Sequence, residues 1–120
     1  MILVDTAVWI DHLHASDDTL VSLLDQDRAG THPMVIEELA LGSMKNRARV
    51  LRLLGNLWKF PVLSHVELLA LVDHHRLAGR GLSATDAHLL GSVLLVPGAQ
   101  LWTRDKALQA AATEASVAFM

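Results

Sequence analysis

The sequence opens with a short apolar run that stops at an acidic residue and passes directly into a helical pattern. Residues 2–4 read Ile-Leu-Val, Asp5 follows, and Val8, Trp9 and Leu13 then recur at helical spacing. A short continuous apolar run is typical of a strand that is buried on both faces, as in parallel sheets covered by helices. The opening segment therefore predicts a strand that leads straight into a helix, with Asp5 or the threonine after it placed to cap that helix.

Short strands alternate with helical stretches along the rest of the chain. Apolar runs predict strands at residues 100–103 and 116–119, a brief extended piece is expected around residues 31–32, and residues 60–63 read as a connector or an edge strand. Apolar periodicity and capping signals predict helices at residues 6–14, 20–30, 33–42, 45–57, 65–79, 84–96 and 105–112. Ser64 with Glu67 and Ser83 with Asp86 have the spacing of capping boxes, and Pro33 can open the helix at 33–42. The helix at 45–57 has an expected apolar face of Val50, Leu53, Leu54 and Leu57. This alternation predicts one α/β domain over residues 1–120, with a central, mostly parallel β-sheet flanked by helices on both faces.

The composition excludes several classes of function. The absence of cysteine excludes a thiol nucleophile, a disulfide framework and a cysteine-based zinc site. A net charge of −3 provides no overall field for a polyanion, so nucleic-acid binding would need a local basic patch or metal ions. The mean hydropathy of +0.34 predicts apolar surface that meets a partner or a second copy. Because no basic leader and no long apolar run are present, we expect a cytoplasmic protein without a membrane span.

Four acidic residues stand where a ligand site is expected. Asp5 and Asp105 follow predicted strands, and ligands of open α/β sheets bind beyond the carboxyl ends of the strands. Asp86 falls in the first turn of a predicted helix, and Glu38 lies in a largely apolar helical stretch. Clustered carboxylates repel one another, and hard divalent cations such as Mg2+ or Mn2+ compensate that repulsion with oxygen ligands. A metal held in this way can activate a water for attack on a phosphate.

Each acid also has a simpler explanation. Asp5, Asp86 and Asp105 all stand at positions where an aspartate commonly caps a helix. Helical periodicity does not distinguish Glu38 from its neighbour Glu37, since both border apolar residues. The residues alone therefore leave two interpretations open, an acidic metal site and a set of helix caps.

Four segments carry a resemblance that goes further. They are MILVDTAVWIDHL at the start of the chain, then PMVIEELALG, GLSATDAHLLGSVL and LWTRDKALQ. In this order and at about these separations, they resemble the motif blocks of the PIN-domain nucleases, and especially the VapC toxins of bacterial toxin–antitoxin pairs. The resemblance assigns a metal-binding role to Asp5, Asp86 and Asp105. It also places Glu38 in the acidic site, and the Thr-x-Asp block adds Thr103. Gly91 stands where such sequences usually carry a small helix former.

The resemblance implies a metal-dependent endoribonuclease. Mg2+ or Mn2+ would activate a water that cuts the RNA backbone, leaving a 5′ phosphate and a 3′ hydroxyl. Asp5, Asp86 and Asp105 would bind the metal, Glu38 would complete the site directly or through water, and Thr103 would orient a water or a carboxylate. No further acid follows Asp105 in the first turn, so two permanently bound ions are not implied.

The same resemblance implies partners, and alternatives remain open. It implies an RNA substrate, a VapB-like antitoxin that covers the acidic groove and apolar surface, and a homodimer. A PIN protein that processes RNA without an inhibitor is one alternative, and a binding module whose acids are only caps is another. A phosphoryl-transfer domain with Asp5 as nucleophile is disfavoured, because it gives no role to Glu38 or to the Thr-x-Asp block.

Basic residues and histidines are the remaining candidates. On a helical projection Lys45, Arg49 and Arg52 form one stripe, which is either a solvated face or a phosphate-binding surface. Arg104 is a further RNA-binding candidate because it adjoins the last acid block. The seven histidines show no metal-ligand spacing and are expected at the surface or half-buried.

Overall fold

The computed structural model describes residues 1–120 and contains one parallel sheet in the order β3-β2-β1-β4. Its strands are β1 (Ile2–Val4), β2 (Ala29–Thr31), β3 (Trp58–Lys59) and β4 (Gln100–Trp102). The helices are α1 (Thr6–His14), α2 (Asp18–Asp25), α3 (Pro33–Leu41), α4 (Arg47–Gly55), α5 (His65–His74), α6 (Ala84–Leu94) and α7 (Lys106–Glu114). The predicted α/β class is confirmed.

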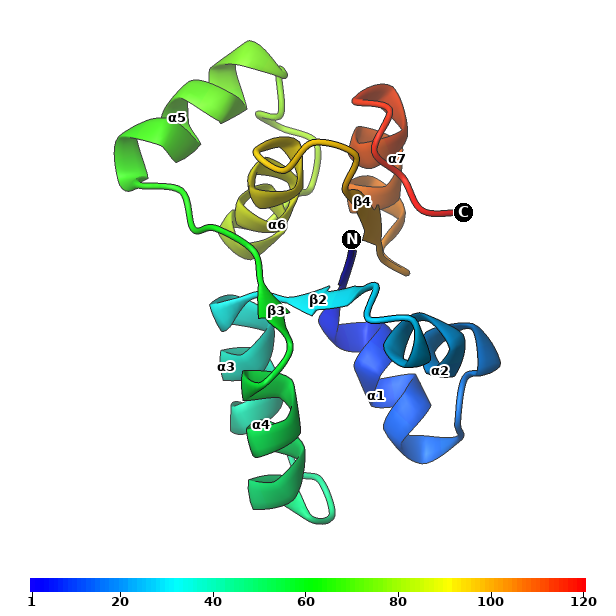
Figure 1. Ribbon diagram of the computed structural model, residues 1–120. Helices are drawn as coiled ribbons and strands as arrows, with labels where there is room; N and C mark the ends of the chain where they lie inside the picture. The colour runs from blue at the N-terminus through cyan, green and yellow to red at the C-terminus, as the bar shows by residue number, and fades with distance from the viewer.

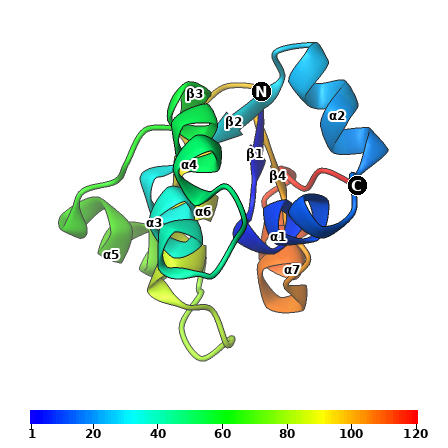
Figure 2. The same ribbon diagram turned by 90° about the horizontal axis from the view of Figure 1, so that it is seen from below.

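The helices form two layers, one on each face of the sheet. Helices α1 to α4 lie on one side, and α5 to α7 lie on the other (Figure 1). Figure 2 views the molecule from the side of α1 to α4. Within the layers, α3 packs on α1 and α4, and α6 packs on α5 and α7. Strands β1 and β2 are almost fully buried, with all three residues of β1 exposing 1% or less of their surface, whereas both residues of the edge strand β3 are exposed.

The strand order creates a crevice beside β1. The chain passes from β1 to β2 and β3 on one side, and it later returns to β4 on the other side. The connections after β1 and β4 therefore diverge at the carboxyl ends of two neighbouring strands, which is where open α/β sheets bind ligands. Asp5 and Thr103 are the first residues after these strands.

The region around β2 differs from the prediction. The expected helix at residues 20–30 ends at Asp25, and Gly30 lies inside β2 instead of ending a helix. A Cβ atom on residue 30 would lie 2.6 Å from the Phe60 ring. Glycine is therefore required here by a contact between neighbouring strands, which the local sequence does not reveal.

Helix α4 is shorter than predicted and differently buried. It spans Arg47–Gly55 instead of residues 45–57, because the chain makes a left-handed turn at Asn46. Of the apolar face expected on this helix, Leu54 is buried, whereas Leu53 is 57% exposed. Since α4 packs mainly on α3, one apolar row is enough to hold it.

Two other elements end early. Helix α5 stops at His74 instead of residue 79, because the chain turns at Arg76 with a φ of 51°. The strand expected at residues 116–119 is reduced to a single bridge between Leu101 and Ala118. None of the seven helices has the length and apolar character that a membrane crossing requires.

The glycine inside α6 has a packing role. A Cβ atom on Gly91 would lie 2.7 Å from a Leu63 methyl carbon and 2.9 Å from one of Leu71. Glycine is intrinsically unfavourable within a helix. Because Gly91 has no side chain, however, the segment before α5, and α5 itself, can pack directly against the backbone of α6.

Candidate functional site

Asp5 is held at the crevice by both its backbone and its side chain. Its N–H donates to the Trp102 carbonyl (2.9 Å), which extends the pairing of β1 with β4 by one residue. Its Oδ1 accepts from the Thr6 N–H (2.7 Å), so Asp5 caps α1. Its Oδ2 accepts from the Thr103 hydroxyl (2.7 Å). Only 9% of Asp5 is exposed, and its carboxylate is therefore fixed in one orientation.

Thr103 links two of the predicted acids. While its hydroxyl donates to Asp5, its Oγ1 accepts from the Asp105 N–H (3.1 Å). Asp105 caps α7, since its Oδ1 accepts from the Leu108 N–H (2.8 Å). The Thr-x-Asp segment therefore places Thr103 in contact with Asp5, and Asp105 is connected to Asp5 only through Thr103.

Asp86 enters the site from α6. It forms the predicted capping box with Ser83, in which the Ser83 Oγ accepts from the Asp86 N–H and Asp86 Oδ2 accepts from the Ser83 N–H, each at 3.0 Å. Asp5, Asp86 and Asp105 therefore all take part in helix capping, as one of the two interpretations predicts, but capping does not use every carboxylate oxygen. Asp86 Oδ1 and Asp105 Oδ2 have no hydrogen-bond partner in the protein.

The electrostatics distinguish Glu38 from Glu37. The pKa of Asp5 is raised mainly by burial, partly offset by its hydrogen bonds to Thr103 and Thr6, and it is raised further by the charges of Asp86 and Glu38. Glu37 makes no such contribution. Asp5, Asp86 and Glu38 therefore form one repelling group although they come from three segments of the chain.

The donor chemistry of this group fits a hard divalent cation. The carboxylate of Glu38 makes no hydrogen bond, and the free oxygens of Asp86 and Asp105 are of the type that Mg2+ and Mn2+ prefer. As the side chains lie, no three acidic or histidine groups are close enough to hold an ion together. The carboxylates would thus have to close around an ion as it binds.

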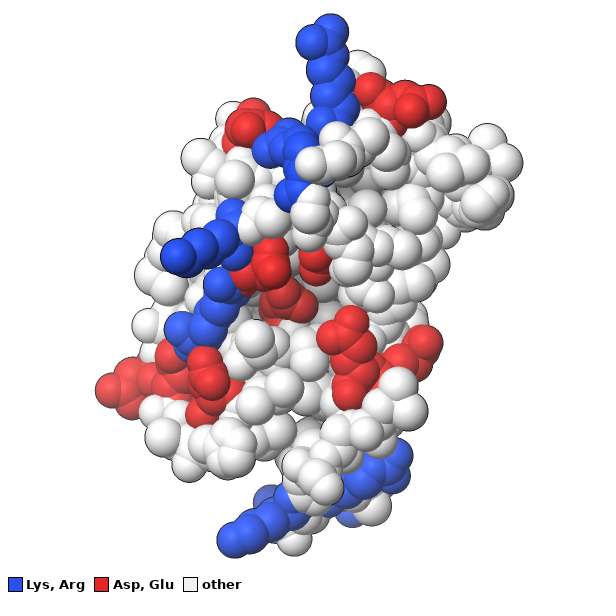
Figure 3. Space-filling model, turned by 180° about the vertical axis from the view of Figure 1, so that it is seen from behind, with Lys and Arg blue, Asp and Glu red and all other residues white.

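Basic side chains lie around the acids. Figure 3 shows acidic side chains in a hollow near the middle of one face, with basic side chains to the left of and above the hollow and a separate basic group at the lower end of the face. Lys45, Arg49 and Arg52 are exposed and make no ion pair, and Lys45 lies in the turn before α4. Arg76 and Lys106 are equally unpaired, and Lys106, which directly follows Asp105, is not among the cations predicted from the sequence.

Arg104 differs from these cations. Its Nε lies 2.8 Å from Asp11 Oδ2 and its Nη2 lies 3.5 Å from Asp17 Oδ2. Its guanidinium is therefore already neutralised by carboxylates of the same chain.

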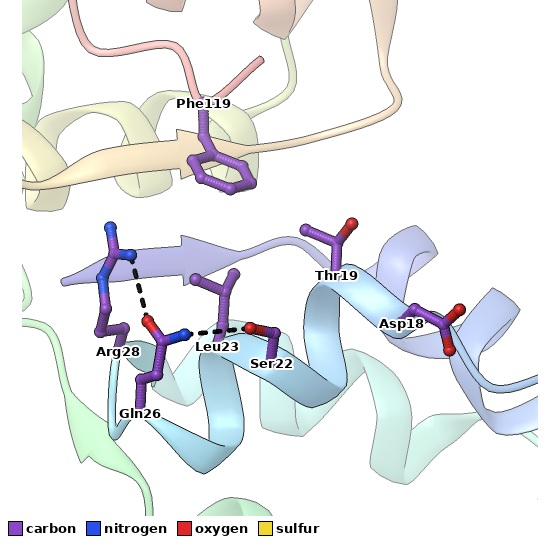
Figure 4. Close-up of a pocket in the computed structure, with 7 residues that line it drawn as sticks. All are labelled: Asp18, Thr19, Ser22, Leu23, Gln26, Arg28 and Phe119. Carbon is purple, nitrogen blue, oxygen red and sulfur yellow. Dashed lines mark hydrogen bonds between the residues drawn. The ribbon is translucent and has the colours of Figure 1, made fainter.

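A groove of about 920 Å3 begins at Glu38 and runs between α1 and the α3–α4 pair. Its apolar side chains include Ile10, Leu13 and Leu53, all of which are more than 40% exposed, and its rim carries Lys45 and Arg49. A second hollow, of about 390 Å3, lies between α2 and Phe119 and contains none of the four acids (Figure 4).

One histidine contradicts the expectation of surface positions. His32 is fully buried, and its Nδ1 accepts from the Met34 N–H (3.1 Å), which caps α3. Its Nε2 lies 3.0 Å from Ser92 Oγ on α6. Burial, with a smaller contribution from His88, lowers the pKa of His32 to about 4, so the ring is neutral at physiological pH.

The fold and the site together define a class of protein: a parallel α/β domain with acids gathered where the strand order reverses. The family model of the PIN domain matches residues 2–114. The chain therefore belongs to the PIN-domain family, as the four sequence blocks indicate.

Relatives support the same assignment. Ribonuclease VapC32 of Mycobacterium tuberculosis is 65% identical over 118 residues, which make up 98% of this chain and 95% of the relative. The sequence in a second strain of that species gives the same values. The predicted similarity to VapC proteins is thus confirmed. The crystal structure of PAE2754 from Pyrobaculum aerophilum matches with a TM-score of 0.61 at 19% identity, covering 98% of this chain and 87% of that one, and shows the same fold.

Proposed function

We propose that residues 1–120 act as one nuclease domain, a Mg2+- or Mn2+-dependent endoribonuclease that serves as the toxin of a toxin–antitoxin pair in the cytoplasm. The observation that carries this proposal is the coupling of buried Asp5 to Asp86 and Glu38 at the carboxyl end of β1. A cluster of this kind costs folding energy unless a cation compensates it. The 65% identity to a ribonuclease supports RNA as the substrate.

The residues have distinct roles in this mechanism. Asp5, Asp86 and Asp105 hold the ion, and Glu38 completes the site directly or through water. When bound, Mg2+ or Mn2+ would supply a water of lowered pKa and would neutralise charge on the phosphate. Thr103 fixes the orientation of the Asp5 carboxylate by its 2.7 Å hydrogen bond. The cut leaves a 5′ phosphate and a 3′ hydroxyl.

The unpaired cations guide the substrate to this acidic site. RNA would be repelled by the carboxylates, so its backbone needs positive charge on either side of them. Lys45, Arg49 and Arg52 supply that charge on the side of α4, and Lys106 supplies it beside Asp105. Arg104, which the sequence also suggests for this role, is instead paired with Asp11 and Asp17.

The groove beside Glu38 is the surface that a VapB-like antitoxin would cover. Its exposed apolar side chains would be buried by a bound segment, and a segment that reaches Glu38 also blocks the acids. We further propose a homodimer, in keeping with the apolar side chains that remain exposed on α5, Val66 and Leu69.

Cleavage of a defined RNA tests the proposal. The wild type should cut with Mn2+ and stop with chelator, and Asp5→Ala, Glu38→Ala, Asp86→Ala and Asp105→Ala should each lose at least 100-fold, of the order expected when charge stabilisation is removed (~3 kcal/mol). Glu37→Ala is the matched control, because it removes a neighbouring glutamate that does not influence Asp5. Loss in Glu37→Ala with full activity in Glu38→Ala would show that the wrong acid was chosen. Metal-independent cleavage would refute the mechanism.

A further inference from the structure

The Arg104 side chain joins three parts of the molecule. Beyond its ion pairs with Asp11 and Asp17, its guanidinium carbon lies 5.9 Å from the centroid of the Trp102 ring. Asp11 belongs to α1, and Asp17 is the N-cap of α2, where its Oδ1 accepts from the Leu20 N–H (3.0 Å). One side chain from the β4–α7 turn thus holds the corner between α1 and α2.

The position of Arg104 in the chain connects this contact to the acidic site. It stands between Thr103, which bonds Asp5, and Asp105, which caps α7. Its partner Asp11 lies on α1, the helix that begins at the Asp5 cap. The two halves of the site, Asp5 on one segment and Thr103 with Asp105 on the other, are therefore linked a second time, outside the site, through Arg104.

We propose that Arg104 is a positioning residue that sets the spacing of Asp5 and Asp105, and that it does not bind RNA. The inference rests on the nuclease function proposed above and adds a residue to it. Two carboxylates already face this single cation, so the local charge around it is negative. An RNA phosphate would have to displace both of them, whereas Lys45, Arg49 and Arg52 are free.

The exposure of these groups determines what the contact contributes. The side chains of Arg104 and Asp11 are 42% and 59% exposed, and ion pairs this exposed add little to stability. A planar guanidinium that engages two carboxylates and an aromatic ring nevertheless restricts geometry, which an ammonium group does not do. Because displacement of a reacting group by about 1 Å can cost up to 100-fold in rate, the contact should affect catalysis more than stability.

The test uses the full chain and compares Arg104→Ala with the double variant Asp11→Asn/Asp17→Asn. Asparagine keeps the cap of α2 and removes the charges that hold Arg104. We expect both variants to lose about tenfold in kcat, with unchanged KM, an unchanged dependence of RNA affinity on salt, and a melting temperature close to that of the wild type. The triple variant, which combines Arg104→Ala with Asp11→Asn and Asp17→Asn, should lose no more in kcat than Arg104→Ala or the double variant alone. Without RNA, the Mn2+ concentration that gives half of the metal-induced rise in melting temperature should increase in both.

A matched control removes a different ion pair. Arg80 contacts Glu114 through two short pairs, 2.8 and 2.9 Å, and Glu114 lies at the opposite end of α7 from Asp105. Arg80→Ala should leave kcat and the Mn2+ response unchanged.

The outcomes separate the two levels of the proposal. Wild-type kcat in the double variant, or a weaker salt dependence of RNA affinity with normal kcat in Arg104→Ala, would overturn the positioning role. A wild type that does not cleave RNA with Mn2+ would instead refute the nuclease function on which it rests.

Discussion

Replacement of His32 by asparagine should remove an acid sensitivity built into the fold. The buried imidazole accepts from the Met34 N–H through Nδ1, so Nε2 carries the proton and donates to Ser92 Oγ. A second proton can bind only at Nδ1, where it would break the cap of α3. The neighbouring His88 also disfavours a positive charge on His32. Asparagine can retain the cap, because its Oδ1 can accept in place of Nδ1.

The magnitude follows from the pKa of His32. Burial lowers this pKa from 6.5 to about 4, so between these values the unfolded chain binds a proton that the folded chain does not. The stabilisation is complete above pH 6.5 and is lost as the pH falls toward 4. The full loss is about 3 kcal/mol, of which about 2 kcal/mol has been lost by pH 5.

Urea unfolding followed by tryptophan fluorescence at pH 8, 7, 6 and 5 measures this effect. His32→Asn should be less stable at pH 8 by about 1–3 kcal/mol, because it loses the Ser92 hydrogen bond and some packing. The difference in free energy of unfolding between the wild type and His32→Asn should be about 2 kcal/mol smaller at pH 5 than at pH 8. His74→Asn is the control, since His74 is exposed and should follow the wild-type curve. A deficit in His32→Asn that is the same at pH 8 and pH 5 would refute the reasoning.

Three further predictions concern the site and the packing around it. With chelator, Asp5→Asn should be at least as stable as the wild type, because it removes a buried charge that neighbouring carboxylates repel. Mn2+ at ten times its Kd should raise the melting temperature of the wild type by about 5 °C and leave that of Asp5→Asn unchanged. A loss of stability in Asp5→Asn that is independent of metal would favour a plain cap. Lys45→Ala/Arg49→Ala/Arg52→Ala should weaken RNA binding and flatten its salt dependence without abolishing cleavage at saturating RNA, and an unchanged slope would make this a solvated surface. Gly30→Ala should destabilise by about 1–3 kcal/mol in urea unfolding, because the added methyl collides with Phe60. Gly55→Ala meets no atom within 4 Å and should be neutral or slightly stabilising, so equal losses in both would contradict the packing argument.

Local signals predicted the features that depend on neighbouring residues. The strand that stops at Asp5, the two capping boxes and the proline that opens α3 all involve contacts within a few positions, and each is found in the structure. The four acids could be selected because strand ends and motif spacing are properties of the sequence itself.

Features that depend on distant contacts were not predictable in this way. Gly30 was read as a helix end because its conflict with Phe60 arises only once β2 and β3 are adjacent. Helical periodicity could not separate Glu38 from Glu37, because the difference depends on the position of Asp5 in space. Arg104 resembled a free cation in the sequence, since Asp11 and Asp17 approach it only after α1, α2 and β4 have packed.

Three acids serve both as helix-capping residues and as proposed metal ligands. This has a consequence for how such a protein can be inactivated, in the laboratory or by mutation in a population. Asp5, Asp86 and Asp105 each accept a hydrogen bond that begins a helix. An alanine at any of the three therefore removes a proposed metal ligand and weakens the fold together, and the damaged chain becomes a substrate for cellular proteases. Asparagine separates the two effects, because it keeps the cap and removes the charge. Lineages that retain an inactive but intact copy should accordingly carry asparagine at these positions more often than alanine.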